Sequence, residues 1–157
     1  MTLARQALAV ARLQTGQGTP DARARLAAWD RLQGLLSTLD SKTSVLLRFN
    51  AIVVAALAYV LIVSGADPFQ GGNALVGAIG KAMGHLSLVA AIASCGFAFP
   101  VIGVERGYVG ELDEATIERK AALVERRTLY YAWAWRLAVA GGSGFALLVG
   151  LASLHLK

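Results

Sequence analysis

Four cationic side chains are the strongest candidates for a binding site in this sequence. Lys42 and Arg48 come just before an uncharged run of 18 residues, Phe49 to Ala66, and Arg126 and Arg127 come before the last apolar segment. Cations beside an apolar segment suit a phosphate, whether on a lipid or on a free anion. We therefore expect an anion or lipid-headgroup site at these four residues, with a solvated helix surface as the simpler alternative.

Residue types that support catalysis are sparse. Cys95 is the single cysteine and lies in an apolar run, which excludes an intrachain disulfide and a thiolate cluster. His85 stands alone at the edge of an apolar segment, where an interfacial role with a water partner is the simpler expectation. Glu118 and Glu125 lie among cations and suit solvated ion pairs. We expect a protein that is not an enzyme and has no metal or cofactor.

The composition is that of a membrane protein. Of the 157 residues, 56% are hydrophobic and 16% are charged, and the mean hydropathy is +0.56. Soluble domains carry about 25% charged residues, so we predict a single integral membrane domain. The net charge of +5 does not indicate nucleic acid, because the cations are grouped by segment as membrane topology requires.

Three segments almost free of charge are long enough to cross a bilayer as helices. They are predicted at about 49–66, 84–104 and 132–154, and at 1.5 Å per residue each covers roughly 27 Å or more. Residues 73–83 are expected to be helical and to lie at the interface. Pro100 is expected to kink the second span.

A long amphipathic helix is predicted ahead of the first span. It begins near Asp21 and continues without a break into the span, with Gly34 as its weakest point. The apolar residues along one side of it are Leu32, Leu36, Leu39 and Leu46.

A second amphipathic helix is predicted to begin near Asp113 and to run into the third span, with acids first and cations after them, as suits a helix dipole. Its apolar side carries Ile117, Ala121, Val124, Thr128 and Tyr131. We expect the two amphipathic helices to pack as a cytoplasmic stalk. The residues expected to meet there are Leu36 and Leu39 on the first helix and Val124 and Ile117 on the second. The predicted fold is all-α, with three transmembrane helices of which the first and third extend into the stalk.

The predicted organisation is a membrane domain with short ends. Residues 1–20 should form an amphipathic segment and a loop, residues 21–154 the membrane domain, and residues 155–157 a tail. A cleaved signal peptide is the alternative for the start of the chain, although its apolar region is short.

A stripe of small residues recurs every four positions along the third span. Its members are Ala134, Ala138, Gly142, Ala146 and Gly150. Small residues let helix backbones approach closely in lipid, so the stripe predicts a helix contact. The contact lies either within one chain or between copies in a homo-oligomer.

The segment LLSTLDSKTSVLLRFNAI resembles the entrance of the Pycsar effector transmembrane family, which is related in style to the SLATT domains. The shared pattern is an Asp-x-Lys pair followed by two leucines that lead into a span, here Asp40, Lys42, Leu46 and Leu47. The later segment ERKAALVERRTLYYAWAWRLAVAG is similar to that family's second half. Looser matches there are Lys120, Tyr131 and Ala134.

The resemblance implies an antiviral effector that impairs the inner membrane when a nucleotide signal or a protein partner activates it. A cyclic-nucleotide-binding domain is not recognisable in this sequence, which leaves the trigger open. We expect a non-enzymatic effector that oligomerises. The alternative is a structural subunit or assembly factor of a larger membrane complex, and a small transporter is disfavoured because the spans lack paired charges.

The first prediction concerns topology. All Lys and Arg except Lys81 and Lys157 fall in segments assigned to one side, so the N-terminus should lie in the cytoplasm of a bacterial cell and the C-terminus outside the inner membrane. In a Cys95→Ala background, single cysteines at positions 73 and 157 should react with an impermeant thiol reagent in intact cells. Reaction at position 17 or 116 would contradict the three-span arrangement.

Overall fold

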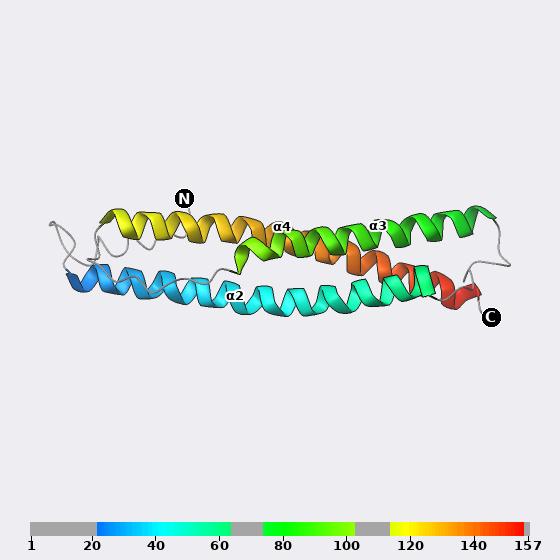
Figure 1. The fold of residues 1–157 in the computed structure, drawn as a ribbon, viewed down its shortest axis with the longest axis horizontal. Coiled ribbons are helices and arrows are strands. Elements are labelled where there is room, and N and C mark those ends of the chain that lie inside the picture. Colours follow the sequence, from blue (N-terminus) through cyan, green and yellow to red (C-terminus); the bar gives the residue numbers. More distant parts are fainter. Residues whose placement is uncertain (1–21, 64–73, 103–113, 156–157) are drawn as a thin grey trace. The chain divides into compact units, whose positions relative to one another are not determined.

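The described part of the chain is entirely helical. The computed structural model describes residues 22–63, 74–102 and 114–155. Helix α2 (Ala22–Ala58) continues into a π-helical segment, η1 (Tyr59–Val63), and α3 (Ala74–Ala98) continues into a 3-10 turn, η2 (Phe99–Val101). Helix α4 (Glu114–His155) follows (Figure 1). The predicted all-α class is confirmed for these residues.

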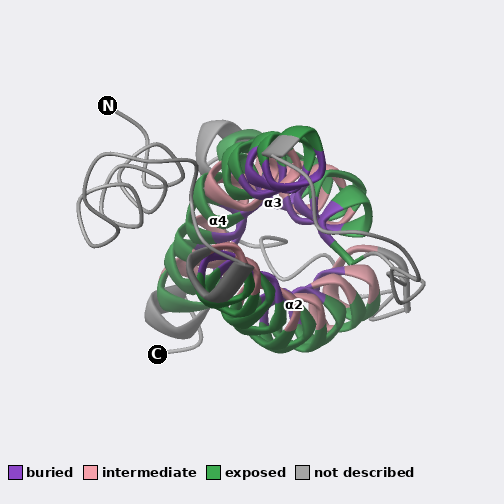
Figure 2. Cartoon of the chain, turned by 90° about the vertical axis from the view of Figure 1, so that its left-hand side faces the viewer, coloured by how far each residue is buried: buried purple, intermediate pink, exposed green. Residues whose placement is uncertain are grey.

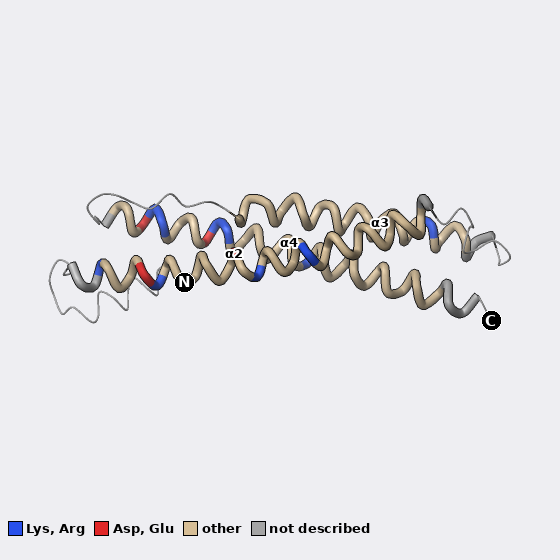
Figure 3. Tube along the Cα trace, turned by 60° about the horizontal axis from the view of Figure 1, so that its bottom comes forward, with Lys and Arg blue, Asp and Glu red and all other residues tan. Residues whose placement is uncertain are grey.

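Three helices are long and apolar enough to cross a membrane, as expected. They include α2 with the start of η1, α3 with η2, and α4. Figure 3 shows why: Lys, Arg, Asp and Glu gather along the first parts of α2 and α4, and the remainder of both helices is almost free of charge. An apolar stretch of this length is stable as a helix in lipid because its backbone polar groups bond within the helix.

Two local expectations change. Residues 74–98 form one continuous helix, so the segment expected to lie at the interface belongs to α3. Pro100 lies in η2, after α3 has ended, and does not kink it. Proline disfavours the α conformation in the residue before it, which accounts for an end at this point. The predicted segment 1–20 and the tail beyond His155 lie outside the described residues.

The chain divides into two compact units. One contains residues 1–43 and 100–131, and the other contains 44–99 and 132–157. In the first unit α2 and α4 share a buried cluster made of Ala28, Leu32, Leu36, Ile117, Ala121 and Val124. The predicted packing of these two helix segments is therefore present in the structure.

The contact surface of the first unit departs from the predicted one at two positions. Leu39 is only half-buried and lies outside the cluster, whereas Thr43 is fully buried and donates a hydrogen bond to the Leu39 carbonyl oxygen over 2.7 Å. On α4 the predicted Thr128 is exposed, and Arg127 is buried one position earlier. In each helix, a polar residue is buried in place of the residue that the spacing predicted: Thr43 in place of Leu39, and Arg127 in place of Thr128.

The second unit has its own apolar core. Val53 and Leu57 of α2, Ala91 of α3 and Leu148 of α4 are buried together. Figure 2 shows the buried residues along the sides of the helices that face other helices, with exposed residues on the outer sides. Many outer residues are large and apolar, which suits a hydrocarbon surrounding.

A charge in the first unit's cluster should open it. Leu36 is 2% exposed, so Leu36→Asp buries an unpaired carboxylate and should cost roughly 3 kcal/mol. Thermal unfolding and limited proteolysis of the purified protein measure the loss. Ser37→Asp adds the same charge at an exposed neighbouring position and is the control. Equal behaviour of the two variants would contradict the packing.

Candidate functional site

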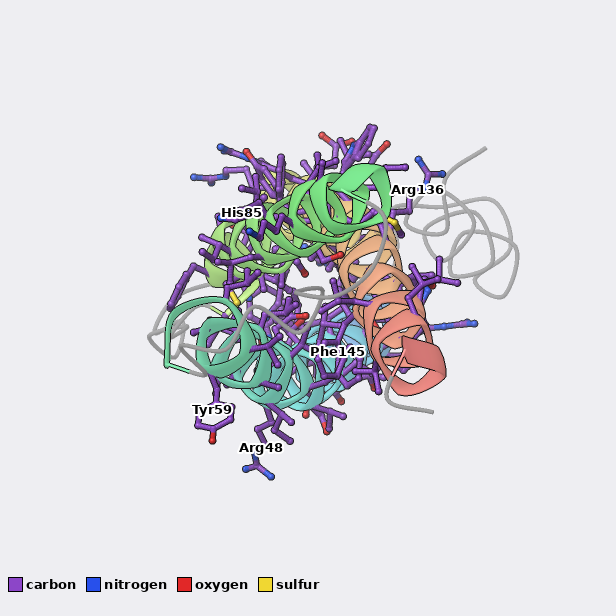
Figure 4. The ribbon with its side chains drawn as sticks, turned by 90° about the vertical axis from the view of Figure 1, so that its right-hand side faces the viewer. Arg48, Tyr59, His85, Arg136 and Phe145 are labelled. Atoms are coloured by element: carbon purple, nitrogen blue, oxygen red, sulfur yellow. The ribbon has the colours of Figure 1, made fainter. Side chains whose placement is uncertain are left out.

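The four predicted cations are divided between the two units: Lys42, Arg126 and Arg127 lie in the first unit, and Arg48 lies in the second. Lys42 and Arg126 are exposed, and Arg127 is buried in the same unit. Arg48 belongs to the second unit, where its side chain points away from the helices (Figure 4). These four residues therefore supply separate surface charges and one internal charge.

Arg127 is the internal charge, and its nearest ionic partner is Asp40 on α2. The distance from Arg127 Nη1 to Asp40 Oδ1 is 3.9 Å, and the Arg127 side chain is 9% exposed. The Asp40 side chain is 38% exposed, so water screens this long contact and its contribution to stability is small. The pair links α2 to α4 at the end of the first unit.

Arg126 is held by an aromatic neighbour one turn along α4. It donates a hydrogen bond to the Tyr130 hydroxyl over 3.5 Å, and its guanidinium lies 5.6 Å from the centre of the Tyr130 ring. The hydrogen bond raises the pKa of Arg126, so the side chain stays charged throughout the physiological range. An exposed cation of this kind suits a headgroup phosphate.

Lys120 is a second buried cation, which the sequence pattern did not place among the candidate site residues. Its ammonium lies 3.4 Å from the centre of the Trp29 ring and donates a hydrogen bond to Gln33 Oε1. The side chain is 7% exposed, and a desolvated cation–π contact contributes about 2 kcal/mol. Its spacing from Ile117 and Val124 is the sequence signal that places it on the buried side of α4.

A polar layer joins the three helices of the second unit. The Asn50 amide nitrogen on α2 donates to Ser94 Oγ on α3 over 2.7 Å, and that hydroxyl donates to the Ala134 carbonyl oxygen on α4 over 2.6 Å. Asn50 and Ser94 are fully buried, and Asn50 Oδ1 has no hydrogen-bond partner. Asn50 was missed, although a lone amide in an uncharged run is a signal in its own right.

The small-residue stripe divides into two parts. Ala134 and Ala138 are buried, and a Cβ at Gly142 would lie 3.1 Å from the Phe49 ring. Ala146 is exposed, and nothing lies within 4 Å of a Cβ placed on Gly150. The first three residues therefore pack within the chain, and the last two face outward.

Gly141 and Gly144 lie close against Ser87 and Ala91 of α3. A Cβ on Gly141 would lie 3.1 Å from the Ser87 carbonyl oxygen, and one on Gly144 would overlap the Ser87 hydroxyl. These two positions, which lie off the predicted stripe, need glycine for close backbone packing.

The remaining candidates lie mostly at the surface. His85 and Glu118 are exposed, and His85 Nδ1 lies 2.7 Å from the Lys81 carbonyl oxygen. Figure 4 shows Tyr59 and Arg136 pointing outward and Phe145 pointing between the helices. Within the described ranges no three of the His, Cys, Asp and Glu side chains group as metal ligands.

The polar layer should be a coupled unit. Ser94→Ala removes the acceptor of the Asn50 amide and should destabilise the second unit by about 1 kcal/mol. Adding Asn50→Leu to Ser94→Ala should recover most of the lost stability, because both polar side chains are then absent. Unfolding of the single and double variants in detergent gives the interaction energy, with the exposed Ser143→Ala as control. Additive effects would show that the layer is not coupled.

Comparison with known proteins gives no family for this chain. No protein-family model, no curated protein and no solved structure matches it.

Proposed function

We propose that this chain is a non-enzymatic inner-membrane effector that oligomerises and impairs membrane integrity in antiviral defence. The observation that carries the proposal is the outward face of α4, where Ala146 is exposed and Gly150 borders open space. Small residues on an outward face give a second helix close access to the backbone. A further copy of the chain is the partner that suits such a face.

A membrane lesion requires several copies. The polar side chains of the layer, Asn50 and Ser94, face inward, while residues such as Ile52, Val89 and Leu147 face outward. One such bundle has no continuous polar surface that could line water. An assembly of bundles supplies new surfaces between copies, so oligomerisation and lesion formation are one step in this proposal.

The buried cations of the first unit are the groups on which an activating ligand would act. Arg127 with Asp40, and Lys120 with Trp29, join α2 to α4 there. A nucleotide or a protein that competes for one of these cations would loosen the pair of helices. The resemblance of the segments around Lys42 and Lys120 to the Pycsar effector transmembrane family supports the same role.

The alternative is a structural subunit or assembly factor of a larger membrane complex. The same outward face of α4 favours it, because a different membrane protein can cover Ala146 and Gly150 equally well. A subunit should purify with a fixed partner and should not harm the cell alone.

Gly150→Leu tests whether the outward face of α4 is needed for oligomerisation and for the effector function. A side chain there enters open space, so the bundle should stay intact while copies are kept apart. We expect loss of crosslinked oligomers together with loss of growth arrest on overproduction, at unchanged membrane levels. Ala140→Leu adds similar bulk on another exposed part of α4 and should retain both properties.

Two outcomes would favour the subunit instead. One is growth arrest that persists in Gly150→Leu without oligomers. The other is a parent protein that is monomeric and harmless even with its genetic neighbours and a phage challenge supplied. Gly142→Leu should behave differently from Gly150→Leu, because its side chain would also strain the contact with Phe49.

A further inference from the structure

Arg127 carries more hydrogen-bond donors than its surroundings satisfy. The residue is 7% exposed, and within the described part of the chain neither Nε nor Nη1 of its guanidinium has a hydrogen-bond partner. Nε holds one N–H and Nη1 holds two, so three of the five donors lack an acceptor among the described residues. A buried donor without an acceptor has lost its water and gained nothing in return. This guanidinium would therefore gain from an acceptor that reaches it.

The Asp40 carboxylate does not supply these hydrogen bonds. Its Oδ1 lies 3.9 Å from Arg127 Nη1. An N–H···O hydrogen bond ends at about 3.2 Å, so the contact is one of charge alone. The Asp40 side chain is 38% exposed, and its contact with water weakens the attraction further. Because this carboxylate already reaches water, it can leave Arg127 without losing its hydration.

The other buried cation of the first unit is better satisfied. The Lys120 ammonium lies over the Trp29 ring and donates a hydrogen bond to Gln33 Oε1. An aromatic face and an amide oxygen, both from α2, therefore surround this compact charge. Of the two buried cations, Arg127 is the one whose donors are open to a ligand.

Phosphate is the ligand chemistry that suits this guanidinium. A planar guanidinium forms charge-assisted hydrogen bonds with phosphate, whose several oxygens can accept from more than one nitrogen. The surrounding charge favours an anion as well, because Lys and Arg outnumber Asp and Glu among the described side chains of the first unit. Lys42 and Arg126 are exposed members of that excess, so they attract anions from solvent to this unit.

We propose that Arg127 binds a phosphate group, which takes the place of the Asp40 carboxylate beside the guanidinium. The phosphate oxygens accept hydrogen bonds from the donors that Asp40 leaves unsatisfied, and Asp40 keeps its contact with water. Because Asp40 lies on α2 and Arg127 lies on α4, the exchange removes one link between the two helices. This consequence rests on the proposed function and deepens it, since it assigns the activating ligand to phosphate compounds. The binding itself can be measured without that function.

Titration calorimetry with pyrophosphate tests the site on the full chain. The protein is held in dodecyl maltoside, which contains no phosphate, and chloride keeps the ionic strength constant. Arg127→Gln should weaken pyrophosphate binding roughly tenfold or more, because a charge-assisted pair is lost. Arg127→Lys keeps the charge without the planar donors and should recover only part of the affinity. Arg119→Gln removes an exposed cation from the same helix and should leave the affinity nearly unchanged.

Asp40→Asn should change the affinity in the opposite direction. Removal of the competing carboxylate should tighten pyrophosphate binding roughly tenfold, because a negative charge is then absent beside the bound anion. Misfolding cannot produce a gain in affinity, so this variant tests the site even if Arg127→Gln is unstable. Asp30→Asn removes an exposed acid from the same helix and unit and is the matched control, with nearly unchanged affinity expected.

Native mass spectrometry separates two sources of the phosphate, a lipid headgroup and a compound in solution. If the site takes a headgroup, protein from mixed micelles with phosphatidylglycerol should retain that lipid in the parent but not in Arg127→Gln, and pyrophosphate should displace it. Equal lipid retention by parent and variant, together with pyrophosphate binding that depends on Arg127, assigns the site to a phosphate compound in solution.

Two results would overturn the inference. One is a parent protein that binds neither pyrophosphate nor phosphatidylglycerol in a manner that depends on Arg127. The other is a pyrophosphate affinity that Asp40→Asn leaves unchanged. Either failure leaves the proposed function standing, because oligomers and growth arrest are measured separately with Gly150→Leu. Conversely, Arg127-dependent binding by a protein that neither oligomerises nor arrests growth would support the site and contradict the proposed function.

Discussion

A polar group buried in an apolar helix bundle has no water to bond, and this constraint shapes the second unit. Backbone groups are satisfied within α2, α3 and α4, and the side-chain polar groups of Asn50 and Ser94 meet each other and a carbonyl oxygen in one layer. Apolar contacts alone would fix the register of the helices weakly, because the hydrophobic effect is non-directional. The layer gives the three helices a defined register, from which the positions of all other groups in the unit follow.

The first unit is held by a different kind of contact. Its apolar cluster is made largely of leucine and alanine, and beside it lie two buried cations, Lys120 over Trp29 and Arg127 near Asp40. A buried cation is costly without a partner, so these contacts favour this pairing of α2 with α4 over other registers. One unit therefore depends on neutral hydrogen bonds, and the other on the contacts of buried cations.

The sequence predicts the helices well, because length, uncharged runs and spacing are local properties. It predicts less of the candidate site. The partner of Asn50 is Ser94, and a local pattern cannot show which residues meet across such a separation. The small-residue stripe shows a second reason: four residues advance about 40° beyond one helical turn, so Gly150 lies far around the helix from Ala134. The buried side of α4 instead continues through Gly141 and Leu148.

The contact between Gly144 and Ser87 also limits how this sequence can diverge. The two positions share one small space, in which even a methyl group on Gly144 would overlap the Ser87 hydroxyl. A side chain at position 144 therefore requires Ser87 to rotate its hydroxyl away or to be replaced by a smaller residue. Among proteins that descend from a common ancestor with this chain, alanine at position 144 should occur together with glycine at position 87. The two helices would then keep their separation while the small residue moves from one to the other.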